Sequence, residues 1–276
     1  MDITVNGNRL YAYVGDHPFD AAKPTIIFVH GVLNDHSVWG LQSRHFAYNG
    51  FNALAIDLPG HGRSDGAPPE SVESAADTIL ALLDALKVRR AALVGHSWGS
   101  LITLEAAGRA PQRVTHLALL GTAFPMKVSP ALLDASLHAP EKAIHMVNTF
   151  SHSTLCPPPS MLGPGTWVYG TSRALMRRTL RNSPRPDLFY TDFLACDRYA
   201  GGEKAMAAVT CPTLFVIGKS DQMAAPRSAR ALANLAAHGR SVEVEAGHAM
   251  MAEAPEVVLN ALRGFLMRPQ TAPAAA

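Results

Sequence analysis

The stretch "LVGHSWGSL", residues 93–101, places Ser97 between Gly95 and Gly99, after one apolar run and before another. The run "AALVG" that leads into it is typical of a buried strand, and "WGSLITLEAAGRA" after it is typical of a helix. A tight strand-to-helix turn strains its central residue and brings neighbouring chain close, so the flanking positions must lack a Cβ. The sequence therefore predicts a turn that lifts the Ser97 hydroxyl above the edge of a sheet.

Short apolar runs alternate with segments of helical spacing along the chain. The strand candidates, rich in β-branched residues, are 25–30, 52–58, 91–96, 115–121, 213–218 and 241–246. The segment "SVESAADTILALLDALKV" (71–88) has an apolar stripe at helical spacing and Ser71 as a candidate N-cap. At the start, "ITVNGNRLYAYV" (3–14) predicts a hairpin about an Asn-Gly turn. This alternation predicts an α/β protein with a mostly parallel central sheet that is flanked by helices on both faces.

The alternation is interrupted between residues 123 and 205. The strand pattern is lost there, and turn-rich patches separate helices that we expect at 130–149, 166–182 and 187–200. We interpret 123–205 as a helical lid inserted above the sheet, with 1–122 and 206–268 forming the core. Residues 269–276 are small and contain proline, and we expect them to form a flexible tail.

Composition excludes several other classes of protein. The chain has 276 residues, 48% of them apolar, and a net charge of +2 without the extended basic face that nucleic-acid binding needs. No stretch reaches the length of a membrane span, and the first residues lack the apolar core of a signal peptide. Cys156, Cys196 and Cys211 show no metal or redox spacing, which is typical of reduced cysteines. We expect a cytoplasmic protein without nucleic-acid or membrane partners, and leave its oligomeric state open.

Two further residues complete a nucleophilic site with Ser97. A serine hydroxyl needs a base to remove its proton, and the base needs an acid to orient it. Asp221 follows a predicted strand at the edge where the carboxyl ends of parallel strands meet, although a turn-capping role is the alternative. His248 follows the last predicted strand, whereas His238 has the position of a cation at a helix C-terminus. We predict that Ser97 is the nucleophile, His248 the base and Asp221 the orienting acid.

Acyl transfer also requires donors for the negative charge that develops on the substrate oxygen. In "IIFVHGVLNDHSVW" (26–39), Gly31 follows the first core strand and lets the next amides turn toward Ser97. We assign the oxyanion hole to the backbone amides of Val32 and Trp98. The amide of Leu33 is the alternative to that of Val32.

The substrate pocket is expected where the lid meets the core. Gly31 and Leu33 are the candidates from the core, and the apolar candidates from the lid, which equally suit the filling of a helical subdomain, are Met126, Leu132, Leu133, Met146, Phe150 and Trp167. Arg173, Arg177 and Arg181 recur every fourth residue, which favours a solvated helix face over recognition of an anionic group. His145, His152 and Cys156 lack ligand spacing, so neither a metal nor a cofactor is expected.

Five motifs in succession resemble those of the α/β-hydrolase superfamily, over nearly the whole chain: "HGVLNDHSVW", "AIDLPGHGRSDG", "LVGHSWGS", "VIGKSDQM" and "AGHAMMAEAPE". The resemblance implies the α/β-hydrolase fold, and 123–205 resembles the family's lid, or cap. The loop "DLPGHGRS" looks like a structural loop near the site, and His30 and His96 are expected to pack or to bind backbone rather than to react. Haloalkane dehalogenases and epoxide hydrolases use an aspartate as nucleophile, and Ser97 stands in that place, which disfavours both.

The residues and the resemblance together predict a serine hydrolase that cleaves a small carboxylic ester through an acyl-enzyme, with water as the second substrate. Three alternatives stay open. One is a C–C bond hydrolase of a carboxylated diketone or dienoic acid, and another is a cofactor-free haloperoxidase or perhydrolase. The third is a ligand-binding protein that has kept the fold without turnover.

Overall fold

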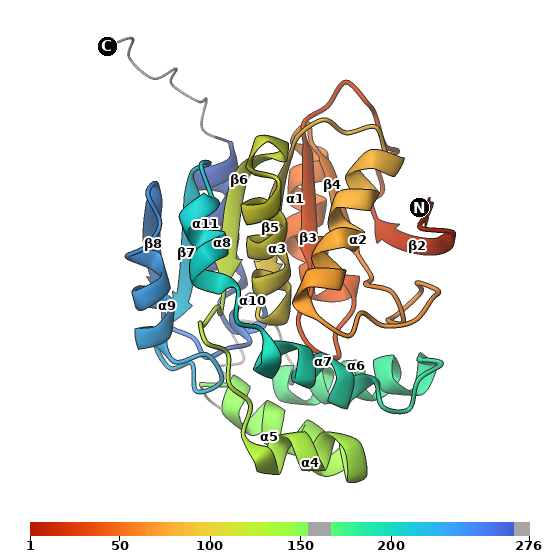
Figure 1. The fold of residues 1–276 in the computed structure, drawn as a ribbon, viewed down its shortest axis with the longest axis vertical. Coiled ribbons are helices and arrows are strands. Elements are labelled where there is room, and N and C mark those ends of the chain that lie inside the picture. Colours follow the sequence, from red (N-terminus) through yellow and green to blue (C-terminus); the bar gives the residue numbers. More distant parts are fainter. Residues whose placement is uncertain (154–166, 268–276) are drawn as a thin grey trace.

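The computed structural model of the protein describes residues 1–153 and 167–267, and these residues contain one eight-stranded sheet in the order β1-β2-β4-β3-β5-β6-β7-β8 (Figure 1). The strands are β1 (Asp2–Val5), β2 (Asn8–Tyr13), β3 (Thr25–Val29), β4 (Asn52–Ile56), β5 (Ala91–His96), β6 (Val114–Leu120), β7 (Thr213–Gly218) and β8 (Gly239–Val244). β1 and β2 pair antiparallel, β2 pairs antiparallel with β4, and every pairing from β4 to β8 is parallel. The prediction of a mostly parallel sheet is confirmed.

Helices cover both faces of this sheet. One face carries α2 (Val72–Ala85), α3 (Trp98–Arg109) and α9 (Pro226–Ala233), and the other carries α1 (Gly40–Tyr48), α10 (Met250–Glu253) and α11 (Pro255–Leu266). Two short 3-10 helices, η1 (His36–Trp39) and η2 (Pro111–Arg113), complete the core. In β5 the neighbours Leu93 and Val94 belong to the two opposite apolar clusters. Because both faces are buried, the central strands are continuously apolar in sequence.

The sequence signals for the start of α2 and for the turn of the N-terminal hairpin agree with the structure. Ser71 caps α2 through a reciprocal pair of hydrogen bonds with Ser74, and the Asn6-Gly7 turn of the hairpin has positive φ at both residues. β8 begins two residues before the predicted start at 241, because it pairs with β7 from Gly239 onward. It is an edge strand with mostly exposed or half-buried residues, so its first residues carry little apolar signal.

The described residues between β6 and β7 form five helices: α4 (Pro130–His138), α5 (Pro140–Ser151), α6 (Val168–Asn182), α7 (Leu188–Arg198) and α8 (Gly202–Ala208). The single helix predicted over 130–149 is two helices, because Ala139 leaves the helical conformation and Pro140 starts a new helix. Figure 1 shows α4 to α7 gathered across one end of the sheet. These four helices share an apolar cluster of their own, which Leu33 joins from the core.

The end of this insertion returns to the core. A Cβ on Gly108 of α3 would lie 2.7 Å from the Cα of Ala205, so α8 packs closely on α3. The boundaries 123 and 205, and the action of this segment as a lid, stay predictions. The predicted tail 269–276 and Cys156 lie outside the described residues, whereas Cys196 and Cys211 are buried free thiols. Within the described part of the chain, none of the helices has both the length and the apolar character needed to cross a membrane.

Candidate active site

Ser97 occupies the strand-to-helix turn that its sequence context predicts. β5 ends at His96 and α3 begins at Trp98, and between them Ser97 has φ 55° and ψ −122°. A Cβ on Gly95 would lie 2.1 Å from the carbonyl oxygen of Gly99, and a Cβ on Gly99 would lie 2.4 Å from that of Val29. Neither glycine can therefore be replaced without displacing backbone. The backbone of Ser97 is therefore in a strained conformation that the surrounding structure must stabilise.

His248 and Asp221 meet in the loops that follow β8 and β7. His248 Nδ1 donates a hydrogen bond of 2.8 Å to Asp221 Oδ2, and both side chains are buried. Asp221 Oδ1 accepts from the amides of Met223 and Ala224, at 2.9 and 2.7 Å. Burial raises the pKa of the Asp221 carboxyl, but His248 and the two amides outweigh it, so that this pKa is below its ordinary value. A carboxylate therefore orients the ring, and the neutral imidazole has its acceptor nitrogen, Nε2, on the opposite side.

Ser97 and His248 line the same two cavities, so the structure brings the three predicted side chains to one place. Among the hydrogen bonds of the described residues, none joins Ser97 Oγ to His248 Nε2. In enzymes without bound substrate this catalytic hydrogen bond is often long and tightens on binding.

The loop after β3 lies directly against Ser97. A Cβ on Gly31 would come within 3.1 Å of Ser97 Cβ, which explains the glycine. Leu33 has φ 52°, and its amide donates to Asp192 Oδ2 at 2.9 Å. The Leu33 amide is thus already engaged, and the assignment of the oxyanion hole to the amides of Val32 and Trp98 stays a prediction.

Asp192 was not singled out from the sequence, although it is central to this loop. It comes from α7, and its Oδ2 atom also accepts a 2.9 Å hydrogen bond from His61 Nε2 in the "DLPGHGRS" loop. Both side chains are fully buried. Burial lowers the pKa of His61, but Asp192 and the carbonyl of Pro59 outweigh it and leave this pKa raised. Asp192 thus ties a helix of the insertion to two core loops, and 131 residues separate it from His61, so no local pattern pointed to the contact.

Two other buried histidines hold backbone in place, as expected from the sequence. His30 Nδ1 donates to the carbonyl of Gly31 at 2.8 Å, and its Nε2 accepts from the amide of Leu58 at 3.1 Å. His96 Nε2 donates to the carbonyl of His248 at 2.8 Å. Burial lowers the pKa of His30 to about 4 and that of His96 to about 3. Both rings are therefore neutral at pH 7.

Two cavities meet at the candidate triad, one of about 740 Å³ and one of about 240 Å³. The described residues common to both linings are Val32, Ser97, Phe193, Met223 and His248. The larger cavity lies between the core and the helices α5 and α6, whereas the smaller one is lined mainly by the insertion. A substrate that reaches Ser97 thus has room on two sides of the reacting bond.

The predicted pocket residues are divided between these cavities and other places. Gly31 lines the larger cavity, and Met126, Leu132, Met146 and Phe150 line the smaller one. Leu33 and Trp167 are not among the described residues that line either cavity. The side chain of Leu33 is fully buried in the insertion cluster, and that of Trp167 is 52% exposed and stacks on Tyr169.

The three periodic arginines have different surroundings. Arg177 pairs with Glu141 at 2.6 Å on the exposed surface, and Arg173 lies over the ring of Tyr169. Arg181 lines the larger cavity, as does Arg178, which binds Asp35 at 2.6 Å. The predicted stripe is therefore not one uniform solvated face.

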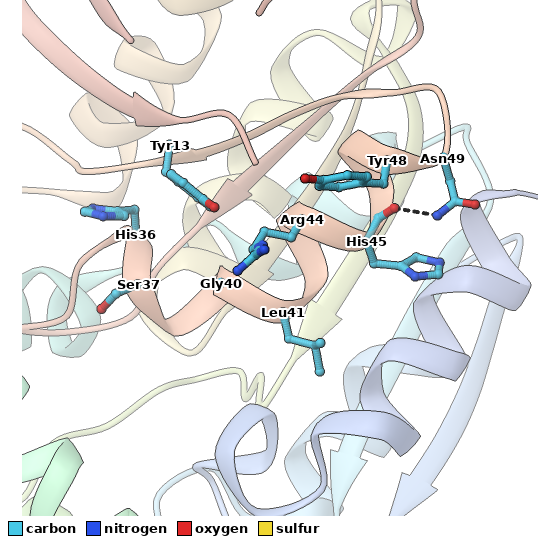
Figure 2. Close-up of a pocket in the computed structure, with 9 residues that line it drawn as sticks. All are labelled: Tyr13, His36, Ser37, Gly40, Leu41, Arg44, His45, Tyr48 and Asn49. Carbon is cyan, nitrogen blue, oxygen red and sulfur yellow. Dashed lines mark hydrogen bonds between the residues drawn. The ribbon is translucent and has the colours of Figure 1, made fainter. Parts of the chain in front are cut away.

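A third cavity, of about 600 Å³, is formed by the side chains of α1 and the residues before it (Figure 2). Neither Ser97 nor His248 lines it. His36 on its rim donates to Asp57 Oδ1 at 2.8 Å, and Asp57 Oδ2 accepts from the amide of Arg63. Asp35, His36 and Asp57 are close enough to share a metal ion, but these bonds and the Arg178 ion pair already use the carboxylates. The structural role of the "DLPGHGRS" loop stays a prediction.

Known proteins resemble this chain in sequence and in fold. An epoxide hydrolase of Caballeronia sordidicola is 34% identical over 127 residues. The match covers 45% of this chain and only 36% of the length of that protein. The (E)-2-((N-methylformamido)methylene)succinate hydrolase of Acinetobacter baylyi is 24% identical over 251 residues, 87% of this chain and 89% of that protein.

The crystal structure of the enol-lactonase from Burkholderia xenovorans LB400 has a TM-score of 0.82 against this structure at 24% identity. The superposition covers 97% of this chain and 100% of the lactonase, which shows a common fold. The model of the alpha/beta hydrolase family matches residues 26–261, which is most of the sequence and includes all three members of the candidate triad. The chain belongs to the alpha/beta hydrolase family.

Proposed function

We propose that this protein is a serine hydrolase that cleaves small carboxylic esters through an acyl-enzyme. The observation that carries the proposal is the buried 2.8 Å hydrogen bond from His248 to Asp221, beside a serine on a strained turn. This arrangement supplies a nucleophile, a base and an acid that fixes the base. A helical segment across the sheet end, which we propose to act as a lid, supplies walls for the substrate.

The proposed reaction has two halves. Ser97 Oγ attacks the ester carbonyl while His248 Nε2 takes its proton, and the amides of Val32 and Trp98 donate to the oxyanion. His248 then gives the proton to the departing alcohol, which leaves Ser97 acylated. A water molecule repeats the sequence on the acyl-enzyme and releases the acid.

The two cavities suit the two parts of an ester. Each begins at Ser97 and His248, so the acyl chain and the alcohol extend in different directions from the reacting carbon. The smaller cavity is lined by apolar side chains such as Met126 and Phe193, which favours a short apolar group on that side. The larger cavity, of about 740 Å³, has room for the bulkier part.

Epoxide hydrolysis is a poorer proposal despite the epoxide hydrolase among the relatives. That likeness covers less than half of this chain. In the epoxide hydrolases that the sequence resembles, an aspartate attacks the epoxide, whereas the turn here presents Ser97. A serine with a histidine base is suited to carbonyl substrates.

A second candidate is hydrolysis of a C–C bond in a carboxylated diketone or dienoic acid by the same three residues. The observation that favours it is Arg181, which lines the larger cavity and has no ion pair within the described part of the chain. The relative from Acinetobacter baylyi acts on a substituted succinate, which is also a carboxylated compound. An arginine at the cavity suits such a carboxylate.

The test is a panel of ethyl esters of graded acyl length beside carboxylated diketones, assayed with wild type and with Ser97→Ala. We expect ester turnover that Ser97→Ala abolishes, and labelling of wild type but not of the variant by a fluorophosphonate. Turnover of the diketone acids without ester turnover selects the second candidate. Unchanged ester turnover in Ser97→Ala contradicts both.

A further inference from the structure

Phe193 comes from the insertion and lines both cavities that meet at the candidate triad. It belongs to α7, is only 4% exposed, and contributes to the wall of the smaller cavity and to that of the larger one. Three of the other described residues common to both linings, Val32, Ser97 and His248, have roles in the proposed reaction. A side chain that forms part of both walls lies where the cavities join, so its size affects how far they are connected.

The position of Phe193 is fixed relative to the reacting groups. The carboxylate of Asp192, directly before it, accepts from the Leu33 amide and from His61 at 2.9 Å each. These bonds tie this point of α7 to the loop after β3. The ring of Phe193 also stacks on that of Phe189, one helical turn earlier, with 5.0 Å between the centroids and 29° between the planes. Phe193 is therefore a rigid part of the wall.

Met223, the remaining residue common to both linings, is a more adaptable part of the same junction. Its amide donates to Asp221 Oδ1, and the residue is half-buried. An unbranched methionine side chain has three rotatable bonds and adapts its shape to its surroundings. Met223 can therefore move aside for a longer ligand, whereas the stacked ring of Phe193 cannot.

The smaller cavity is where a fixed wall matters most. Its volume is about 240 Å³, against about 740 Å³ for the larger cavity, and Met126 and Leu132 add apolar surface to its lining. An apolar chain gains about fourfold in affinity for each methylene group that it buries. This gain ends where the chain meets a wall that does not yield, because overpacking is unfavourable.

We propose that Phe193 is a specificity-determining residue that limits the length of the substrate group in the smaller cavity. The enzyme then takes esters with one short apolar arm and one longer arm, which extends into the larger cavity. The inference rests on the proposed function, because it places the reacting carbon of an ester at Ser97.

Two series of esters test the proposal: ethyl esters of unbranched acids from acetate to decanoate, and acetates of unbranched alcohols from ethanol to decanol. In wild type, we expect kcat/KM to reach a maximum at a short chain in one series and to continue to longer chains in the other. In Phe193→Leu, the maximum of the limited series moves to a longer chain. For the first ester beyond the wild-type maximum, kcat/KM rises about tenfold. Phe193→Ala moves the maximum further, and Phe193→Leu decides the test if the alanine variant does not fold.

The matched control is Phe189→Leu, the same substitution one turn earlier on the same helix. Phe189 is fully buried and is absent from the described lining of both cavities. We expect this variant to be less stable than wild type but to keep the wild-type dependence on chain length. The inference is overturned if neither series has a length limit, if Phe193→Leu leaves the limit unchanged, or if Phe189→Leu moves it equally.

Binding distinguishes a failure of this inference from a failure of the proposed function. In the Ser97→Ala background, calorimetry with the same esters measures the length limit without turnover. If wild type hydrolyses none of the esters but Phe193→Leu moves the length limit in binding, the proposed function fails and the role of Phe193 stands. If wild type hydrolyses the esters with a length dependence that Phe193→Leu does not change, the proposed function stands and this inference fails.

Discussion

The core and the insertion contribute to the candidate site in different ways. Ser97, Asp221 and His248 each lie within a few residues of a strand end, at the edge of the sheet where parallel strands meet. Asp192 and Phe193 lie on α7 of the insertion, and their positions depend on how that helix packs. In the proposed mechanism the reacting groups thus stand on the sheet, and we expect the insertion to adjust their activity. Substitutions in the core are expected to abolish activity, and those in the insertion to change its degree or its specificity.

The largest effect is expected from removing the nucleophile. Ser97→Ala leaves the cavity intact but has no hydroxyl to acylate, so we expect ester kcat to fall about 10⁴-fold or more. Steady-state rates and circular dichroism measure activity and folding separately. The control is Ser172→Ala, a serine on the insertion side of the larger cavity, for which we expect kcat within about threefold of wild type. Similar losses in both variants contradict the division between core and insertion.

The turn that carries Ser97 gives the next largest effect, on stability. Gly99→Ala places a methyl group 2.4 Å from the carbonyl oxygen of Val29, and such overpacking costs about 3 kcal/mol. Gly264→Ala in α11 is the matched control, because a Cβ there meets nothing within 4 Å. In a helix this change stabilises by about 0.5–1 kcal/mol. Urea unfolding of both variants measures whether Gly99→Ala lowers the free energy of unfolding and Gly264→Ala raises it.

These contrasts also explain what the sequence could reveal. The turn at Ser97, the N-cap at Ser71 and the strand ends before Asp221 and His248 are signalled by neighbours within a few positions. Their predicted positions agree with the structure because a parallel sheet brings strand ends together whatever the loops contain. Asp192 carries no such signal, because its partners come from loops far away along the chain.

The pocket residues were predicted less well than the triad residues. Trp167 has the apolar character of a pocket residue, yet its side chain is half exposed and lies away from both cavities in the described structure. Leu33 follows the expected glycine, but its positive φ turns its amide to Asp192. Both cases depend on how segments of the insertion pack, on the core for Leu33 and on Tyr169 for Trp167, which periodicity alone does not define.

Asp192 allows a direct test of how the insertion acts on the core. Asp192→Asn removes the negative charge beside His61 and weakens the anchor of the Leu33 amide, so we expect a loss of about 2 kcal/mol in stability. The loop after β3 also carries the Val32 amide, the proposed oxyanion donor. If Asp192→Asn displaces this amide, ester kcat is expected to fall about tenfold while KM changes little. The control is Asp187→Asn, at the N-cap of the same helix, for which we expect little change in stability or in kcat. A rise in KM alone contradicts the positioning role.

Protonation of the buried core histidines gives a smaller effect. The unfolded chain takes up protons on His30 and His96 near pH 6.5, whereas the folded chain does so only near pH 4 and pH 3. Between these values the unfolded state binds more protons, so stability falls as the pH decreases. We expect each of the two rings to contribute a loss of up to about 2 kcal/mol between pH 7 and pH 5, which the raised pKa of His61 partly offsets. Urea unfolding should show that the stability of His30→Gln depends less steeply on pH than that of wild type. For the control His138→Gln, at an exposed histidine, the pH dependence should equal that of wild type.

The smallest effect concerns the cationic end of the larger cavity. Arg181 is exposed, so a contact with a substrate carboxylate is worth no more than about 1 kcal/mol, or about fivefold in affinity. Arg181→Ala should therefore raise KM for a carboxylated substrate about fivefold and leave that for an uncharged ester unchanged. Arg177→Ala, whose side chain pairs with Glu141, should change neither. The effect should shrink with added salt, because an exposed charge pair is screened. An equal loss for charged and uncharged esters shows that Arg181 supports the helix rather than the substrate, which removes the observation that favours the carboxylated candidates.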